Sequence, residues 1–86
     1  MKTIWKFPLR IGDKMLFMPR DAEMLAVQMQ HGMPMLWAKL DPEQDKVHVK
    51  VLCVGTGGEA PGPTAVYLDT VQDGEFVWHF FMERQA

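Results

Sequence analysis

The sequence predicts an all-β domain, a small antiparallel β-barrel or sandwich of about six to seven short strands joined by tight turns. Successive side chains of a strand point to opposite faces, so alternating apolar residues mark strands with one buried face. Glycine-bearing turns separate the alternating segments, and short turns join antiparallel strands. Residues 1–86 are expected to form a single β domain, and the alternation does not distinguish a barrel from a sandwich. The four alternating segments are Trp5-Phe7-Leu9-Ile11, Leu25-Val27-Met29, Val47-Val49-Val51-Cys53 and Phe76-Trp78-Phe80-Met82.

The first strand is predicted over residues 3–11, with its four alternating apolar side chains facing the core. Pro8 lacks a backbone N–H, which places this strand at a sheet edge or at a bulge. Gly12-Asp13 is predicted to form a two-residue hairpin turn. The returning strand covers residues 14–18 and ends at Pro19.

Two interpretations compete for the segment that follows. Its residues are good helix formers, and Asp21 is a suitable N-cap for a helix over 22–30. A strand over 24–30 is preferred because His31-Gly32 reads as a tight turn into a second alternating segment over 33–40. In these two strands, the residues expected to share an apolar face are Leu25, Val27 and Met29, followed by Met33, Met35 and Trp37.

The second half of the chain follows the same logic. An acidic loop over 41–45 leads into a strand over 46–54 whose valines share one face. A Gly/Pro-rich loop over 55–63 connects it to a strand over 64–71. Asp73-Gly74 is a strong hairpin signal before a last strand over 75–83.

Size and composition limit the classes of protein. A chain of 86 residues buries only about 60–65% of its unfolded surface, so its core is thin. Cys53 is the single cysteine, which excludes a disulfide within the monomer and fits a reducing cytoplasm. Self-association is therefore expected to supply further burial, which predicts a homo-oligomer. The net charge of −2 makes duplex DNA an unsuitable partner. No apolar segment is long enough for a signal peptide or a membrane span, so a cytoplasmic location is expected.

Three segments resemble a family of small uncharacterised proteins encoded by phages and prophages: residues 2–9, 26–38 and 54–57. The most specific part is a Gln-x-Gln strand, a glycine turn and then Leu-Trp-Ala. A histidine usually follows Gly-Thr-Gly in this pattern, whereas Gly58 stands here, which weakens the idea of a shared catalytic histidine at this loop. The resemblance implies a phage-encoded protein in a bacterial host cytoplasm. It brings no established activity and no functional residue.

No catalytic, cofactor or metal signature emerges. By parity Cys53 shares the valine face while His48 points away, which argues against a nucleophile pair with a histidine. The three histidines of the chain lack metal-ligand spacing. The acidic loop over 41–45 lacks the glycine and terminal glutamate of a calcium-binding hand. We therefore expect no enzyme, no cofactor and no metal.

Two features suggest ligand binding instead. Backbone N–H groups in a glycine-rich loop can approach a phosphate closely, although the spacing here is neither Walker nor dinucleotide-binding, and a plain connection is the alternative. Aromatic rings from several strands, with a nearby lysine, can stack a nucleobase if they line one groove, and core packing is the alternative. The candidate ligand-binding residues are Trp5, Trp37, Lys39, Gly55, Thr56, Gly57, Tyr67 and Trp78.

These observations predict a non-enzymatic phage-encoded binding protein that counteracts host defence. Its partner would be a small signalling nucleotide that it sequesters, or a host defence protein that it blocks. The alternative is a single-stranded nucleic-acid-binding barrel or another phage accessory protein, against which the acidic net charge argues.

Overall fold

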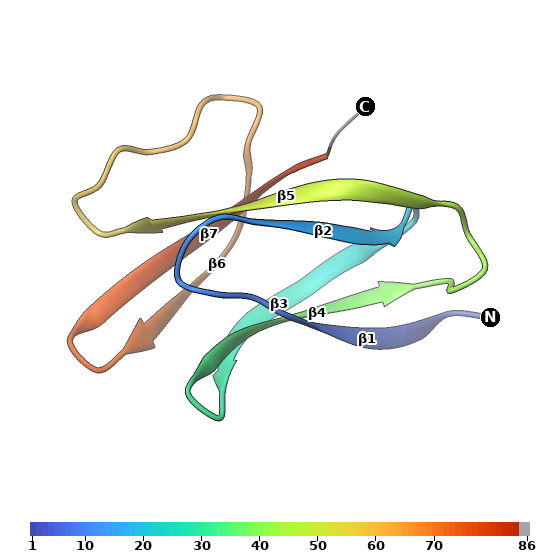
Figure 1. Cartoon of the computed structure of the whole chain (residues 1–86), viewed down its shortest axis with the longest axis horizontal. Coiled ribbons are helices and arrows are strands. Elements are labelled where there is room, and N and C mark those ends of the chain that lie inside the picture. Colours follow the sequence, from blue (N-terminus) through green and yellow to red (C-terminus); the bar gives the residue numbers. More distant parts are fainter. Residues whose placement is uncertain (85–86) are drawn as a thin grey trace.

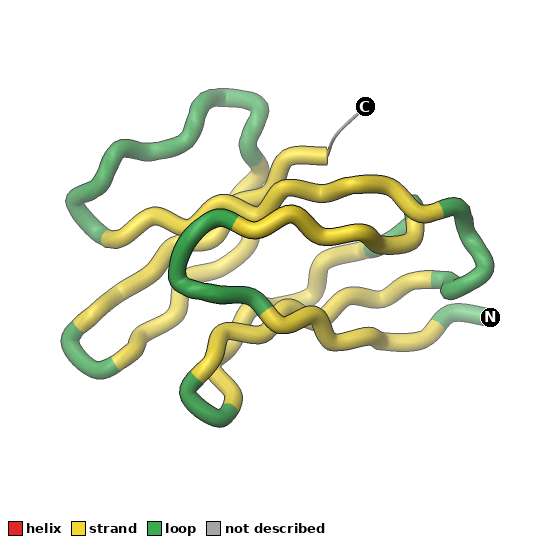
Figure 2. The backbone as a smooth tube through the Cα atoms, viewed as in Figure 1, coloured by secondary structure: helices red, strands yellow, loops and turns green. Residues whose placement is uncertain are grey.

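The computed structural model describes residues 1–84, which form seven strands in two antiparallel sheets. The three-stranded sheet has the order β1-β4-β3 and the four-stranded sheet the order β2-β5-β7-β6 (Figures 1 and 2). No helix capable of crossing a membrane occurs in the described part of the chain. The strands are β1 (Thr3–Pro8), β2 (Lys14–Pro19), β3 (Glu23–Gln30), β4 (Met33–Leu40), β5 (Lys46–Gly55), β6 (Val66–Asp73) and β7 (Phe76–Arg84).

The two sheets pack as a thin, sandwich-like fold whose Cα atoms extend over 40 × 30 × 15 Å. No ladder joins one sheet to the other within residues 1–84, so the predicted class is confirmed as all-β and the sheets do not close into a barrel. Both sheets contribute alternating residues to one core, as the period of two requires. Its fully buried members include Val27, Leu36 and Leu40 from one sheet and Val49 and Phe80 from the other.

The first strand differs from its prediction. β1 is an edge strand, as Pro8 indicated, but it ends at that proline and Ile11 is 43% exposed. The predicted Gly12-Asp13 hairpin is wrong, because β1 pairs with β4 and β2 pairs with β5 in the other sheet. Residues 9–13 therefore cross between the layers, and this route buries Leu9 between them.

The strand predicted over 24–30 is confirmed, and the competing helix over 22–30 is wrong. His31 and Gly32 have φ values of 54° and 76° between the paired residues Gln30 and Met33. Two consecutive positive φ angles define the turn type whose twist suits a two-residue hairpin. The local turn signal was therefore decisive against helix propensity.

The faces of β3 and β4 required correction. A register shift between Met24 and Ala26 turns Leu25 outward, where it is 46% exposed, while Met24 packs against the core. In β4 the buried face is Leu36, Ala38 and Leu40 instead of the predicted Met33, Met35 and Trp37. Apolar residues occupy both parities of this strand, so alternation alone does not identify the inner face.

The second half largely follows its prediction. Val47, Val49 and Val51 of β5 face the core, with Val49 0% exposed, whereas Val54 lies on the outer face. The last hairpin is confirmed one residue later than predicted, because Asp73 pairs with Phe76 across Gly74-Glu75. β6 begins at Val66 rather than at Thr64, and the loop after β5 projects from the body of the molecule (Figure 1).

Candidate functional site

A chain of hydrogen-bonded side chains lies on the outer face of the four-stranded sheet. The Nε2 atom of His79 lies 2.7 Å from Thr56 Oγ1, and its Nδ1 atom lies 2.9 Å from Thr70 Oγ1. The Thr70 hydroxyl lies in turn 2.7 Å from the Tyr67 hydroxyl. We call these four residues the His79 chain. Both nitrogens of the half-buried imidazole are thus bonded to hydroxyl groups.

Strand register explains why three strands contribute to this chain. His79 in β7 is paired with Thr70 in β6 and with Val54 in β5, two residues before Thr56. Tyr67 and Thr70 are three residues apart, a spacing that places side chains on opposite faces of a regular strand. A register shift between Tyr67 and Asp69 adds one residue, and this bulge brings both hydroxyls to the same face.

The turn after β5 holds Thr56 in place. The Gly58 N–H donates to the Gly55 carbonyl at 2.9 Å, and Gly57 has a φ of 93°, as the third residue of a type II turn requires. A Cβ atom at Gly55 would lie 3.1 Å from the Trp78 ring, so glycine also serves close packing there. The Thr56 N–H donates to the Val77 carbonyl. Two of the N–H groups expected to cradle a phosphate are therefore already used within the backbone.

A cavity of about 240 Å³ opens beside this turn. Val54, Ala60 and Phe81 give it apolar walls, and Thr56 and His79 give it polar groups. Ligand sites generally combine apolar walls with a few convergent polar groups. This cavity has apolar walls and polar groups, and the Thr56 and Thr70 hydroxyls hold the His79 imidazole in place.

A second cavity, of about 420 Å³, lies by the same turn, next to two stacked rings. The rings of Phe76 and Trp78 are 5.8 Å apart with an interplanar angle of 18°, and Phe76 is 63% exposed. The Trp78 Nε1 atom is buried and has no hydrogen-bond partner among residues 1–84. Trp78 lies on the same face of β7 as Phe80, opposite His79, and packs against the core beside Gly55.

The remaining predicted residues lie in the three-stranded sheet. Trp5 packs against the core, whereas Trp37 occupies the outer face, where it pairs with Lys6 and Ala26. Lys39 is exposed on that same outer face. The structure thus gathers one part of the predicted set and leaves the other part separate. The gathered residues are Gly55, Thr56, Gly57 and Tyr67, and the separate residues are Trp5, Trp37, Lys39 and the core-facing Trp78.

Sequence reasoning missed His79, Thr70 and Phe81. Parity does place His79 on the face opposite Phe80, which was the one available signal. The bulge that brings Tyr67 and Thr70 together has no marker in the sequence, because neither glycine nor proline stands there.

Cys53 lies on the valine face, as parity predicted, and is paired with Phe80. Burial raises the pKa of the Cys53 thiol, the nearby Asp13 charge raises it further, and a hydrogen bond from the Gly12 backbone acts in the opposite direction. No group of three or more histidine, cysteine, aspartate or glutamate side chains within residues 1–84 is placed to hold a metal ion.

Comparisons with known proteins bear on the whole chain. No curated protein and no solved structure matches it. One family does match, over residues 1–86, and its description is a domain of unknown function. The chain therefore belongs to the family "Domain of unknown function (DUF7352)".

Proposed function

We propose that this protein is a non-enzymatic binding protein that holds the planar ring of a small nucleotide-type ligand in the cavity beside Thr56 and His79. The observation that carries the proposal is the His79 chain, which lies against a cavity with apolar walls. A hydroxyl donates or accepts according to its rotation, and a neutral imidazole has one donor and one acceptor nitrogen. The chain can therefore present either a donor or an acceptor to the edge of a base.

Binding fits this geometry better than catalysis does. A general base needs a nitrogen within hydrogen-bond reach of the proton that it removes from the substrate. Both His79 nitrogens already contact threonine hydroxyls. Val54 and Phe81 offer apolar surface on which a ring can pack, which supplies affinity without chemistry.

The resemblance to phage-encoded proteins supports a biological setting for this activity. A phage would gain an advantage from a protein that removes a signalling nucleotide from a host defence system in the bacterial cytoplasm. A short β-sandwich with one ligand pocket is sufficient for sequestration, because stoichiometric binding needs affinity alone.

Capture of a host defence protein is a second form of host interference, and one surface favours it. Met15 and Phe17 on β2 are 51% and 56% exposed, and the Phe17 ring lies 4.8 Å from the His48 ring. Exposed aromatic and methionine side chains are common at protein interfaces. The single-stranded nucleic-acid alternative has less support, because Trp5 and Trp37 lie on opposite faces of their sheet.

The test is native mass spectrometry of the protein purified from bacterial cells, repeated with a panel of cyclic and ADP-ribose-type nucleotides. We expect a stoichiometric nucleotide mass on the wild-type protein and its loss in Thr56→Val, which removes the hydroxyl that contacts His79. Thr64→Val is the matched control, because the Thr64 hydroxyl donates to Glu83 outside the cavity. The same spectra give the subunit count and so test the expected homo-oligomer.

Two results would contradict the proposal. One is a wild-type protein that retains no nucleotide and binds none from the panel. The other is equal retention by Thr56→Val and by wild type, which would place the ligand elsewhere on the molecule.

A further inference from the structure

The edges of β3 and β6 face each other where the two sheets meet, on the side of the sandwich away from β1. Residues 22–26 lie across from 66–68, and residues 27–29 lie across from 69–72, so the two strands run in the same direction. We call this junction the seam. The Asp69 carboxylate of β6 bridges the seam by accepting the Val27 N–H of β3 at 3.0 Å, and it also accepts the N–H of its neighbour Thr70 at 2.9 Å.

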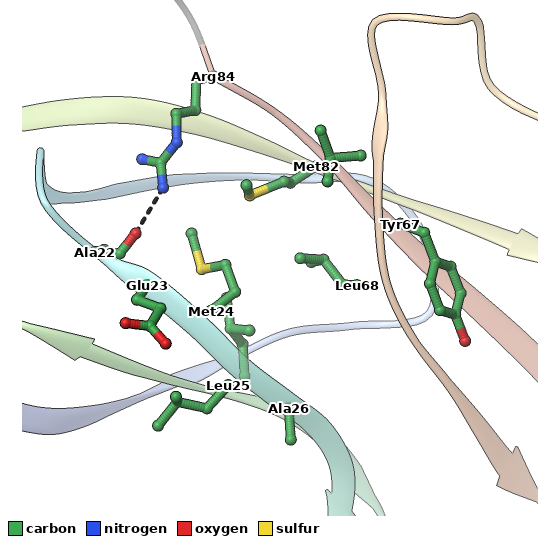
Figure 3. A pocket seen from close by; sticks show the side chains of 11 residues that line it. Ala22, Glu23, Met24, Leu25, Ala26, Tyr67, Leu68, Met82 and Arg84 are labelled. Atoms are coloured by element: carbon green, nitrogen blue, oxygen red, sulfur yellow. Dashed lines mark hydrogen bonds between the residues drawn. The ribbon is translucent and has the colours of Figure 1, made fainter.

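Each strand has a bulge before this carboxylate. The shift in β3 lies between Met24 and Ala26, and the shift in β6 lies between Tyr67 and Asp69. A bulge bends its strand and interrupts the regular edge. The two bulges lie across from each other, and the space between them is a cavity of about 420 Å³ (Figure 3).

The seam cavity has an apolar, adaptable part, and the Glu23 and Arg84 side chains add charged groups to its lining. Figure 3 shows Met24 from β3 and Met82 from β7 extending toward the same space, with Leu68 beside them. The fully buried Leu36 also contributes to its wall. Methionine side chains are flexible and polarizable, and they adjust to an apolar guest of irregular shape.

A cation stands at the rim of this cavity. The Arg84 Nη2 atom donates to the Ala22 carbonyl, 2.6 Å away, and so spans the cavity from β7 to the segment before β3 (Figure 3). A guanidinium has five N–H donors in a planar fork that matches a carboxylate. One bond to Ala22 leaves the group with donors for an anionic headgroup.

We infer that the seam cavity binds a medium-length aliphatic chain with a terminal carboxylate, whose tail lies between Met24 and Met82 and whose headgroup pairs with Arg84. The cavity corresponds to about fourteen water-sized volumes of about 30 Å³ each, which accommodates a chain of about ten carbons with its headgroup. A peptide strand cannot be inserted between the edges of β3 and β6. The gap between them at Val27 is short enough for the single Asp69 side chain to span it, which leaves no room for a backbone between the two strands. This site is separate from the cavity beside His79.

The test is isothermal titration of the whole protein with decanoate and, separately, with decanol. Wild type is expected to bind one decanoate saturably and to bind decanol at least tenfold more weakly. Leu68→Phe fills the cavity and should abolish binding, whereas Leu52→Phe places the same change on a half-buried residue of β5 outside the seam and should not. A melting temperature of Leu68→Phe near that of wild type confirms that its fold is intact.

A second set of variants tests whether Arg84 recognises the carboxylate of the ligand. Arg84→Gln should weaken decanoate at least tenfold and leave decanol unchanged, while Arg20→Gln, an exposed arginine outside the seam lining, should change neither. Saturable binding that Leu68→Phe leaves intact, or no saturable binding by wild type, overturns the proposal. Equal affinity for decanoate and decanol overturns the role of Arg84. Thr56→Val should bind decanoate normally, so failure of the nucleotide proposal is distinguishable from failure of this one.

Discussion

The outer faces of the two sheets use their polar side chains differently. On the four-stranded sheet, Thr56, His79 and Thr70 bond to one another beside a cavity. On the three-stranded sheet, the Lys6 ammonium reaches across β4 and donates to Gln30 at 2.7 Å. The first arrangement is short and fixed by three neighbouring strands, whereas the second consists of two long side chains that span a strand.

This difference teaches what each face is suited to do. The bond between Lys6 and Gln30 passes over the residues of β4, and Met35 beneath it is only 9% exposed although it lies on the outer face. Long polar chains that cover apolar surface keep such a face soluble. The His79 chain instead leaves its cavity open, so the four-stranded sheet is the better candidate for a ligand.

The largest expected effect concerns the core that both sheets share. Phe80 is 0% exposed at the centre of the four-stranded sheet. Phe80→Ala should lower the free energy of unfolding by about 3–5 kcal/mol, because a cavity replaces the ring. Phe76→Ala, on the same strand and 63% exposed, should stay within about 0.5 kcal/mol of wild type. Urea titration measures both free energies of unfolding, and equal losses would show that Phe80 is not part of the shared core.

The next effect concerns the seam that joins the sheets. Asp69→Ala removes the acceptor of the Val27 and Thr70 N–H groups and should cost about 2–4 kcal/mol. Amide exchange should accelerate at Val27 first. Asp73→Ala, at the exposed end of the same strand, is the control and should have little effect. Unchanged exchange at Val27 would exclude a carboxylate link between the sheets.

The glycine turn beside the His79 chain gives a smaller effect. Gly57 has a φ of 93°, so Gly57→Ala should cost about 1–2 kcal/mol. Gly62 lies in the same loop, has no neighbour within 4 Å of an added Cβ and does not adopt a positive φ. Gly62→Ala should therefore be neutral or stabilising by up to about 1 kcal/mol. Thermal unfolding measures the pair, and a reversed order would rule out the type II turn.

A direct comparison of the two outer faces gives a smaller effect again. Thr70→Val removes the hydroxyl that contacts both His79 and Tyr67, and should cost about 1 kcal/mol. Lys6→Met removes the exposed bond to Gln30 and should cost less than about 0.5 kcal/mol. Chemical denaturation of the two variants measures the difference. If Lys6→Met proves the more damaging, the contrast drawn between the sheets fails.

The sequence predicted the strands better than it predicted their partners. Period-two patterns located each strand, and His31-Gly32 identified a true hairpin because both residues adopt positive φ angles. Gly12-Asp13 looked similar but joins two sheets, because β1 pairs with β4 and β2 pairs with β5 instead of with each other. Long-range pairing of this kind leaves no local signature.

The same limit explains the candidate site. The glycine turn, Thr56 and Tyr67 were identified from the sequence as candidates, yet not as neighbours of His79. Their meeting depends on strand order and on a bulge before Asp69, both set by tertiary packing. Trp37 and Lys39 were grouped with them by residue type alone, and residue type carries no information about which sheet holds a strand.

The last prediction uses the single cysteine, which reports on the inner face beneath the His79 chain. Burial raises the pKa of the Cys53 thiol and the Asp13 charge raises it further, so the folded protein should react with iodoacetamide only at higher pH than the urea-unfolded chain. The unfolded chain loses its thiol proton first, so between the two pKa values stability should fall as pH rises. Asp13→Asn keeps an oxygen to accept the Cys53 N–H while it removes the charge. Because burial is the larger cause, Asp13→Asn should remove only the smaller part of the difference in thiol pKa between the folded and the unfolded protein. Full recovery would mean that charge controls the thiol and that the valine face around Cys53 is open to water.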